Sequence, residues 1–293
     1  MDTVLIEVFL PIALAIIMFG LGLGLTTADF ARVARYPRAA AAALGCQILL
    51  LPAACFGLVL LFELPPVLAV GMMLLAASPG GTTANLYSHL FGGDVALNIT
   101  LTAINSVVAV VTLPLVTNLA LTYFVADGGT LGLQFGKTLQ IFAIVLVPVV
   151  LGMLVKRRSP GFAARLSRPV KIASAIILVL VIAGAIATEW ANLGGYIRSV
   201  GAITVLFSVL SLTVGYWVPR LLKVERRQAI ASCMEIGIHN STLAITIALS
   251  PALLGNVEMS IPAALYGLVM FFTAAGAGFL ARRGVKDEPV KAA

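Results

Sequence analysis

Residues 233–242 combine an acid, an imidazole and an amide in one short apolar stretch, as Glu235, His239 and Asn240, with Gly237 between them. This stretch lies near the middle of a long apolar segment, roughly residues 228–254. At bilayer depth a carboxylate costs about 2.5–3.5 kcal/mol on insertion scales. One interpretation is a polar cluster that joins helices by hydrogen bonds. The other is a cation site at a broken helix, where side chains and freed carbonyl oxygens replace the water around an ion.

A second apolar segment, about residues 67–91, is interrupted at its centre by Ser78-Pro-Gly-Gly-Thr-Thr83. Proline removes a backbone donor, and two glycines widen the accessible conformations. A simple proline kink is one interpretation. The threonines and Asn85 that follow favour a new helix N-terminus with its caps. Non-helical backbone at this depth is tolerated only where protein or a water-filled cavity surrounds it.

Further polar side chains lie in apolar segments. Asn98, Thr102 and Asn105 are spaced i, i+4 and i+7, which places them on one helical face. That stripe predicts either an ion-facing seam or a hydrogen-bonded helix interface. Gln47 lies in an earlier apolar segment, where a lone glutamine either joins helices or belongs to a site.

The composition restricts the class of protein that can carry these residues. The chain of 293 residues is 60% hydrophobic and 11% charged, with a mean hydropathy of +1.07. This composition excludes a soluble domain and predicts an all-α polytopic membrane protein. The three cysteines, Cys46, Cys55 and Cys233, lack metal-type spacing and are expected to be packing residues.

The net charge of +7 is explained by where the basic residues lie, so it does not indicate nucleic-acid binding. Only Lys137 and Arg198 lie outside four basic clusters. These clusters are Arg32, Arg35 and Arg38; Lys156, Arg157, Arg158, Arg165, Arg168 and Lys171; Arg220, Lys223, Arg226 and Arg227; and Arg282, Arg283, Lys286 and Lys291. The positive-inside rule places the clusters in the cytoplasm. We therefore expect a multi-pass protein of the cell membrane whose uncleaved N-terminus is outside and whose C-terminus is cytoplasmic.

Apolar segments of about 20 residues predict about nine transmembrane helices. Their approximate ranges are 4–25, 39–62, 67–91, 94–123, 135–155, 169–187, 200–219, 228–254 and 260–281. The third and eighth are the interrupted ones, and being five places apart they run in opposite directions. Paired interruptions of this kind are typical of transporters with inverted repeats. The sequence thus predicts one transmembrane domain over 1–293, with one repeat at about 4–124 and the other at about 169–281.

Two motifs carry a family resemblance. The run Glu235-Ile-Gly-Ile-His-Asn240 resembles the Glu-x-Gly-x-Gln-Asn motif of the bile acid:sodium symporter family. The runs 79–85 and 93–102 are similar to that family's other broken helix and the start of its next one, and Gln47 occupies the place of a family glutamine. The resemblance implies a core of two broken, crossing helices beside a smaller panel of helices.

The resemblance also implies two sodium sites behind the crossing. The first set of ligands would be Asn85, Asn98, Thr102 and Glu235. The second would be Gln47, Glu235, His239 and the carbonyl oxygens of Ile236 and Ile238. Hard cations prefer oxygen ligands, and the first set supplies them.

This chain departs from the family pattern at several positions. Ala84 stands where the family usually has serine, and His239 stands where it has glutamine. Because an imidazole nitrogen is a poorer sodium ligand than an amide oxygen, we expect one intact sodium site and an altered second one. An imidazole can also gain a proton near neutral pH, which makes His239 a candidate pH-sensitive position. The run 268–272 lacks the polar groups that bile-acid carriers use there, so a bile acid is not the expected substrate.

These observations together predict a sodium-driven secondary active symporter of a small organic anion, such as a keto or hydroxy acid. Each half-helix N-terminus at the crossing would carry about half a positive charge and unpaired N–H groups, which suit a carboxylate. The expected substrate donors are Thr82, Thr83, Asn240 and Ser241. The expected partners are sodium, the anion and membrane lipid, and no nucleic acid.

Other functions remain as alternatives. A proton-coupled or ion-independent carrier or channel of the same fold is one alternative, and a bile-acid carrier is another. A membrane receptor belongs to a further class. An intramembrane enzyme could draw on His89 with Asp94 or on Glu235 with His239. The chain has no HExxH motif and no ordered Ser–His–Asp set, so we do not expect an enzyme.

Overall fold

The computed structural model describes residues 3–81, 83–125, 135–188, 193–251 and 253–283, and in these ranges the regular structure is helical. The prediction of an all-α chain is confirmed. The first half contains α1 (Thr3–Gly24), α2 (Thr27–Ala31), the 3₁₀ turn η1 (Arg32–Arg35), α3 (Pro37–Gly45), the π-helical turn η2 (Cys46–Leu50), α4 (Leu51–Leu61), α5 (Pro66–Ala77), α6 (Thr83–Leu90) and α7 (Val95–Phe124). The second half contains α8 (Phe135–Arg158), α9 (Pro160–Thr188), α10 (Leu193–Leu221), α11 (Arg226–Gly237), α12 (Ser241–Leu249), the 3₁₀ turn η3 (Glu258–Ser260) and α13 (Ile261–Arg282).

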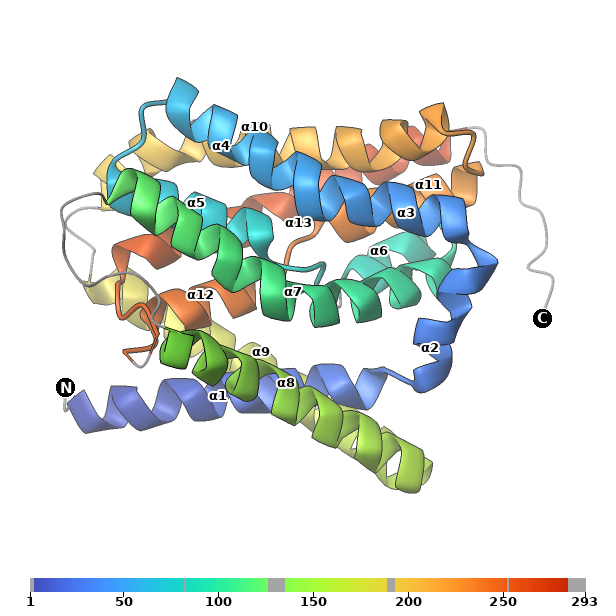
Figure 1. Ribbon diagram of the computed structural model, residues 1–293, viewed down its shortest axis with the longest axis horizontal. Coiled ribbons are helices and arrows are strands. Elements are labelled where there is room, and N and C mark those ends of the chain that lie inside the picture. The colour runs from blue at the N-terminus through green and yellow to red at the C-terminus, as the bar shows by residue number, and fades with distance from the viewer. Residues whose placement is uncertain (1–2, 82, 126–134, 189–192, 252, 284–293) are drawn as a thin grey trace.

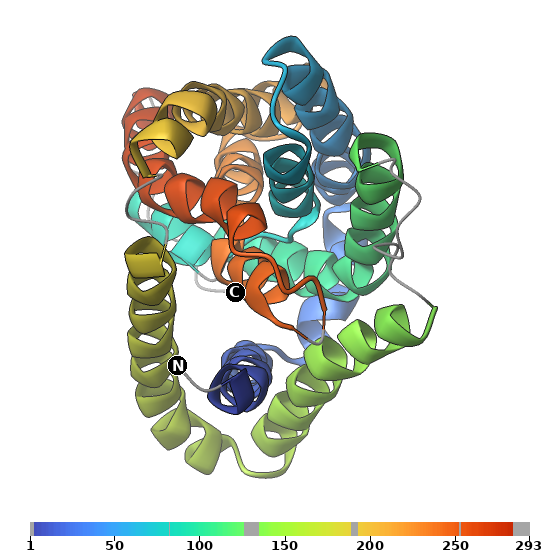
Figure 2. The same ribbon diagram turned by 90° about the vertical axis from the view of Figure 1, so that its left-hand side faces the viewer.

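The helices form two layers (Figures 1 and 2). Helices α1, α8 and α9 make a panel layer, and the remaining helices make a thicker core layer. Within the panel layer α1 and α8 cross at glycines, since a Cβ on Gly22 would lie 2.1 Å from the Val149 carbonyl oxygen and one on Gly152 would lie 2.4 Å from that of Phe19. The glycine run at residues 20–24 therefore permits close helix contact.

Both predicted helix breaks are confirmed. Helix α5 ends at Ala77 and α6 begins at Thr83, while α11 ends at Gly237 and α12 begins at Ser241. At a rise of 1.5 Å per residue, each pair of half-helices is about 30 Å long, which matches the hydrocarbon core of a bilayer. Each pair thus has the length of one interrupted transmembrane segment.

The π-helical turn η2 lies directly before Pro52. Because Pro52 has no N–H, the carbonyl of Ile48 loses its helical donor, and the Leu51 N–H bonds to Cys46 five residues back. Such turns insert one extra residue into a helix and often occur at functional sites. Here the turn contains Gln47, whose side chain is buried.

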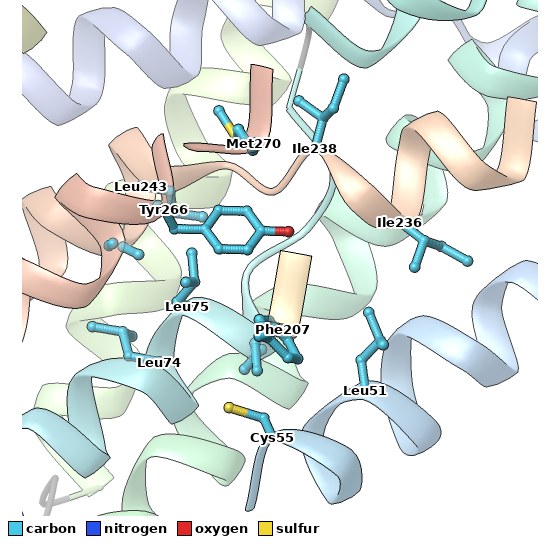
Figure 3. Close-up of a cluster of buried hydrophobic side chains, with 14 of the residues drawn as sticks. Leu51, Cys55, Leu74, Leu75, Phe207, Ile236, Ile238, Leu243, Tyr266 and Met270 are labelled. Atoms are coloured by element: carbon cyan, nitrogen blue, oxygen red, sulfur yellow. The ribbon is translucent and has the colours of Figure 1, made fainter. Parts of the chain in front are cut away.

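Of the described helices, four are long and apolar enough to cross a membrane, namely 37–61, 95–124, 194–221 and 258–282. A fifth is added if the bent pair 15–24 and 27–35 is one segment. The chain is thus a multi-pass membrane protein, and the total of nine helices stays a prediction. Figure 3 shows the core at the break of α11, where Tyr266 of α13 lies near Phe207 and Ile238. All three cysteines are buried and free, as predicted for packing residues.

Candidate functional site

The two breaks meet and pair through their backbones. The Gly81 N–H donates to the Ile238 carbonyl and the Asn240 N–H to the Pro79 carbonyl, each at 2.7 Å, around an antiparallel bridge between Gly80 and His239. We call residues 78–81 and 237–240 the crossing. This pairing satisfies backbone groups that neither half-helix can satisfy alone, as low-dielectric surroundings require.

Side chains from three other elements hold the crossing. The Ser78 carbonyl accepts a hydrogen bond from Gln47 Nε2 at 3.0 Å and lies 3.2 Å from His239 Nδ1. Tyr266 donates to the Gly237 carbonyl at 2.8 Å. Because a carbonyl oxygen only accepts, Nδ1 of His239 carries a hydrogen, and the Nε2 atom is buried without a partner. The His239 ring stacks on Phe207, with ring centroids 5.6 Å apart.

Glu235 lies on the last turn of α11, and none of its surface is exposed. Its Oε2 accepts from Thr102 at 2.6 Å and from Asn98 at 3.0 Å, and its Oε1 accepts from Asn105 at 3.1 Å. All three donors lie on α7, as the i, i+4, i+7 spacing predicts. We call these four residues the acidic site. Gly80 of the crossing packs against the same carboxylate, because a Cβ there would lie 2.2 Å from Oε1.

No positive side chain pairs with Glu235 in the described part of the chain, where the one ion pair joins Arg32 and Asp29. A buried carboxylate normally needs such a partner or a metal. Several buried amide oxygens around the site also lack hydrogen-bond partners. They are Asn85 Oδ1, Asn98 Oδ1, Asn105 Oδ1 and Gln47 Oε1. These amides, where they bond to the site, donate from nitrogen and leave oxygen free, which suits a hard cation.

The residues predicted for the first sodium site are only partly brought together. Asn98, Thr102 and Glu235 are joined by hydrogen bonds, whereas Asn85, on α6, is not among the donors to Glu235. Its buried Oδ1 nevertheless has no partner.

The residues predicted for the second site converge on the crossing. Gln47 and His239 meet at the Ser78 carbonyl rather than at Glu235. The Ile238 carbonyl accepts from Gly81, and Ile236 loses its helical donor because the Asn240 N–H is used by Pro79.

The predicted substrate residues divide between two places. Asn240 caps α12 by accepting from the Leu243 N–H at 3.0 Å and lines a cavity between the layers with Pro79 and Ser106. Ser241 instead faces α13, where its hydroxyl lies 3.9 Å from Met270 Sδ. Thr83 begins α6. Thr82 lies outside the described residues.

The cavity between the layers has a volume of about 20 Å³. Its walls come from α1, α7, α8 and α12 and from the crossing. A volume of this size holds about one water molecule. The two layers are therefore closed on each other at the crossing, where Pro79 and Asn240 line the cavity.

Three residues of this region lie outside the ligand and substrate sets that the sequence predicts. Asn105 was visible in the polar stripe of α7, but its spacing did not show that it reaches Glu235. Ser78 takes part through its backbone carbonyl. Pro79 indicates that backbone groups before it lose their helical partners, but it does not show which carbonyl is used. Nothing in the sequence distinguishes Tyr266, because it is one of several aromatic residues in a mainly apolar helix.

Two crossing helix breaks beside a buried, unpaired carboxylate are typical of ion-coupled membrane transporters. The chain belongs to the Sodium Bile acid symporter family, whose model matches residues 11–195, more than half of its length. The family resemblance of the two motifs is thereby confirmed, and the family consists of sodium-dependent transporters rather than enzymes.

Several curated proteins are similar to the chain. The Uncharacterized sodium-dependent transporter YocS of Bacillus subtilis is 29% identical over 244 residues, which are 83% of this chain and 74% of that protein. The Probable sodium/metabolite cotransporter BASS1, chloroplastic, of Arabidopsis thaliana is 29% identical over 86% of this chain and 61% of its own length. The human Ileal sodium/bile acid cotransporter is 26% identical over 84% of this chain and 70% of its own length.

Proposed function

We propose that the protein is a sodium-coupled secondary active symporter of a small organic anion. The observation that carries this proposal is the Glu235 carboxylate, which is fully buried, has no cationic partner in the described structure and is surrounded by amide oxygens without partners. A carboxylate in that state is costly at membrane depth. A monovalent cation removes the cost by supplying the missing charge and using the free oxygens.

The first sodium would be held by Glu235, Asn98 and Thr102, with Asn85 as the fourth ligand of the set. Asn105 is a further candidate, because its amide nitrogen already bonds to Glu235 and its oxygen is free. Carboxylate, amide and hydroxyl oxygens are the ligands that hard cations prefer.

The second set, Gln47, Glu235, His239 and the carbonyls of Ile236 and Ile238, would bind a second sodium weakly or not at all. His239 Nδ1 is committed to the Ser78 carbonyl, and only a nitrogen, Nε2, remains available on the ring. We therefore propose one sodium per transport cycle at the acidic site.

The coupling of ion and substrate would arise at Gly80. The Glu235 carboxylate packs against this residue of the crossing. Helix α6 begins at Thr83 and α12 begins at Ser241, both shortly after the crossing. An ion that fixes the Glu235 carboxylate also fixes the relative position of α6 and α12. The substrate site is thus completed when sodium is bound.

The substrate we propose is a small carboxylate, such as a keto or hydroxy acid. Helix N-termini favour anions, and Asn240 supplies a polar side chain at the cavity between the layers. Because that cavity of about 20 Å³ holds no organic anion, α1 and α8 must move away from the core layer during transport. The names of relatives include both metabolites and bile acids. The apolar run 268–272 of α13 favours the smaller substrates.

The proposal includes the membrane topology. We infer nine transmembrane segments, in which α5 with α6 and α11 with α12 each count as one. The inverted repeats would be residues 4–124 and 169–281, in one domain, with the N-terminus outside and the C-terminus in the cytoplasm of the cell that carries the protein.

The test is uptake of a panel of labelled carboxylates into proteoliposomes, driven by sodium or pH gradients. We expect uptake that requires sodium, and Glu235→Ala should abolish it. A matched control is Glu225→Ala, which removes an exposed acid at the other end of the same helix. Uptake that does not depend on sodium, or that persists in folded Glu235→Ala protein, would overturn the assignment of a sodium site at Glu235.

A second measurement separates ion binding from transport. The purified protein should be more thermally stable in sodium than in potassium, because a ligand at about 100 times its Kd stabilises the native state by about 2.7 kcal/mol. Glu235→Ala should remove this difference. Stabilisation without uptake would support the ion site and reject the substrate class.

A further inference from the structure

A second, larger cavity lies on the opposite side of α11 from the α7 donors. It has a volume of about 560 Å³ and is formed between α10 and α13, with α11 at its base. Its lining is mainly apolar and includes Val209, Leu212, Trp217, Cys233 and Gly276. We call this cavity the α10–α13 groove.

The groove has the length of one membrane leaflet. It extends from Val209 to Trp217 on α10 and from Thr273 to Ala281 on α13. Eight residues of helix span about 12 Å, and half of a 30 Å hydrocarbon core is about 15 Å. At the end of the groove near Val209, a hydrogen bond of 2.6 Å between Ser208 and Thr273 joins the two helices.

The other end of the groove is positively charged. Arg226 lines it and donates through Nε and Nη2 to the Ala281 carbonyl, at 3.1 and 2.8 Å. No carboxylate pairs with Arg226 in the described structure. Among the described residues, five more cations lie at the adjoining helix ends against one acid, Glu225, and all are exposed: Arg220, Lys223, Arg227, Arg282 and Arg283. The planar guanidinium group of arginine suits phosphate.

Aromatic residues mark the same end as a membrane interface. The rings of Tyr216 and Trp217 meet edge to face at 5.3 Å, and both residues line the groove. Tryptophan and tyrosine are enriched at the level of lipid headgroups. The groove therefore combines an apolar channel, an interfacial aromatic pair and an excess of positive charge.

We propose that the α10–α13 groove binds an anionic phospholipid. One acyl chain lies between α10 and α13, and the headgroup phosphate lies at Arg226. Basic pockets between transmembrane helices on the cytoplasmic side are suited to such headgroups. The occupant contacts Leu212, whose side chain holds the break of α11, because a Cβ on Gly237 would lie 2.2 Å from Leu212 Cδ2. A bound lipid thus stabilises the helix end that carries Glu235.

The experiment uses Trp217 as the reporter. The chain has two tryptophans, Trp190 and Trp217, so Trp190→Phe leaves a single one beside the groove. The protein is reconstituted in phosphatidylcholine vesicles containing increasing fractions of brominated phosphatidylglycerol or brominated phosphatidylcholine. We expect half-maximal quenching at about fivefold lower fractions of phosphatidylglycerol, from about 1 kcal/mol for one arginine near the surface.

Two variants test the two parts of the site. Arg226→Gln should remove the preference for phosphatidylglycerol, while Arg165→Gln, an exposed cation on α9, should keep it. Gly276→Leu should fill the groove and weaken the saturable quenching, because a Cβ at Gly276 meets no atom within 4 Å. A cooperative thermal unfolding transition, measured on each variant, shows that it is folded.

Several outcomes would overturn the proposal. Equal quenching by both brominated lipids, or an unchanged preference in Arg226→Gln, would reject the anionic headgroup. Unchanged quenching in Gly276→Leu would place the lipid elsewhere. Quenching that is weak in all variants and falls as protein concentration rises would assign the groove to a second copy of the chain.

Discussion

Gly80 provides the sharpest test of the proposed link between the acidic site and the crossing. A Cβ at this position would lie 2.2 Å from Glu235 Oε1, 2.3 Å from its Cδ and 2.7 Å from Oε2. Real side chains do not tolerate contacts this short, so in Gly80→Ala the carboxylate must move. Its backbone φ is not in the left-handed region, and alanine therefore meets no conformational barrier there.

The carboxylate cannot move without losing hydrogen bonds. Oε1 accepts from Asn105, and Oε2 accepts from Asn98 and Thr102. Overpacking of a tight core costs about 1–3 kcal/mol, and each hydrogen bond to a charged group contributes about 1.5–3 kcal/mol. The loss of one such bond at the ion site corresponds to an increase of about tenfold or more in the sodium concentration for half-maximal uptake.

The adjacent glycine supplies a matched control. In Gly81→Ala the new Cβ would lie 3.3 Å from the His239 carbonyl oxygen, which needs a shift of a few tenths of an ångström, and 3.5 Å from that of Ile238, which is an ordinary van der Waals contact. Initial uptake against sodium concentration, together with thermal unfolding in detergent, is measured for both variants. If Gly80→Ala matches Gly81→Ala in sodium dependence and stability, the carboxylate is not held against the crossing and the coupling argument is wrong.

Three more predictions follow from the site and the charge pattern. Asn105→Ala should raise the sodium concentration for half-maximal uptake about tenfold, because it removes one donor to Glu235 and one free oxygen. An unchanged sodium titration would remove Asn105 from the site. His239→Gln should raise the Hill coefficient for sodium, because an amide oxygen replaces the unpartnered Nε2; sodium titrations at several pH values that superimpose on those of the wild type would show a packed core histidine. Reporter fusions should place the N-terminus outside and the C-terminus in the cytoplasm, because 17 basic residues lie on one predicted side and two on the other; both ends on one side would change the helix count by one.

The breaks and the polar face of α7 could be predicted from the sequence because their causes are local. Pro79 and its two glycines remove a donor and steric limits within a few residues, and the break of α11 falls at Gly237. Likewise, the spacing of Asn98, Thr102 and Asn105 fixes their common face whatever surrounds the helix.

The partners of these residues could not be predicted in the same way, because they depend on how distant segments pack. Spacing shows that Asn105 shares a face with Asn98 but does not show that Glu235 lies opposite both. Similarly, Gln47 was expected beside an ion, whereas the π-helical turn directs its amide nitrogen to the Ser78 carbonyl. The hydroxyl of Tyr266 reaches the Gly237 carbonyl from a mainly apolar helix.

The use of amides rather than additional acids gives the site a definite charge. Within the described structure Glu235 is the one carboxylate of the acidic site, and its other members are neutral. One sodium then makes the site neutral, whereas a second acid would leave it charged at a depth where charge costs several kcal/mol. Because each amide donates to the carboxylate from nitrogen, it supports the acid without an ion and would offer its oxygen to the proposed sodium. On the proposed assignment, the same residues would stabilise the site before and after sodium binds, which an ion-coupled cycle requires.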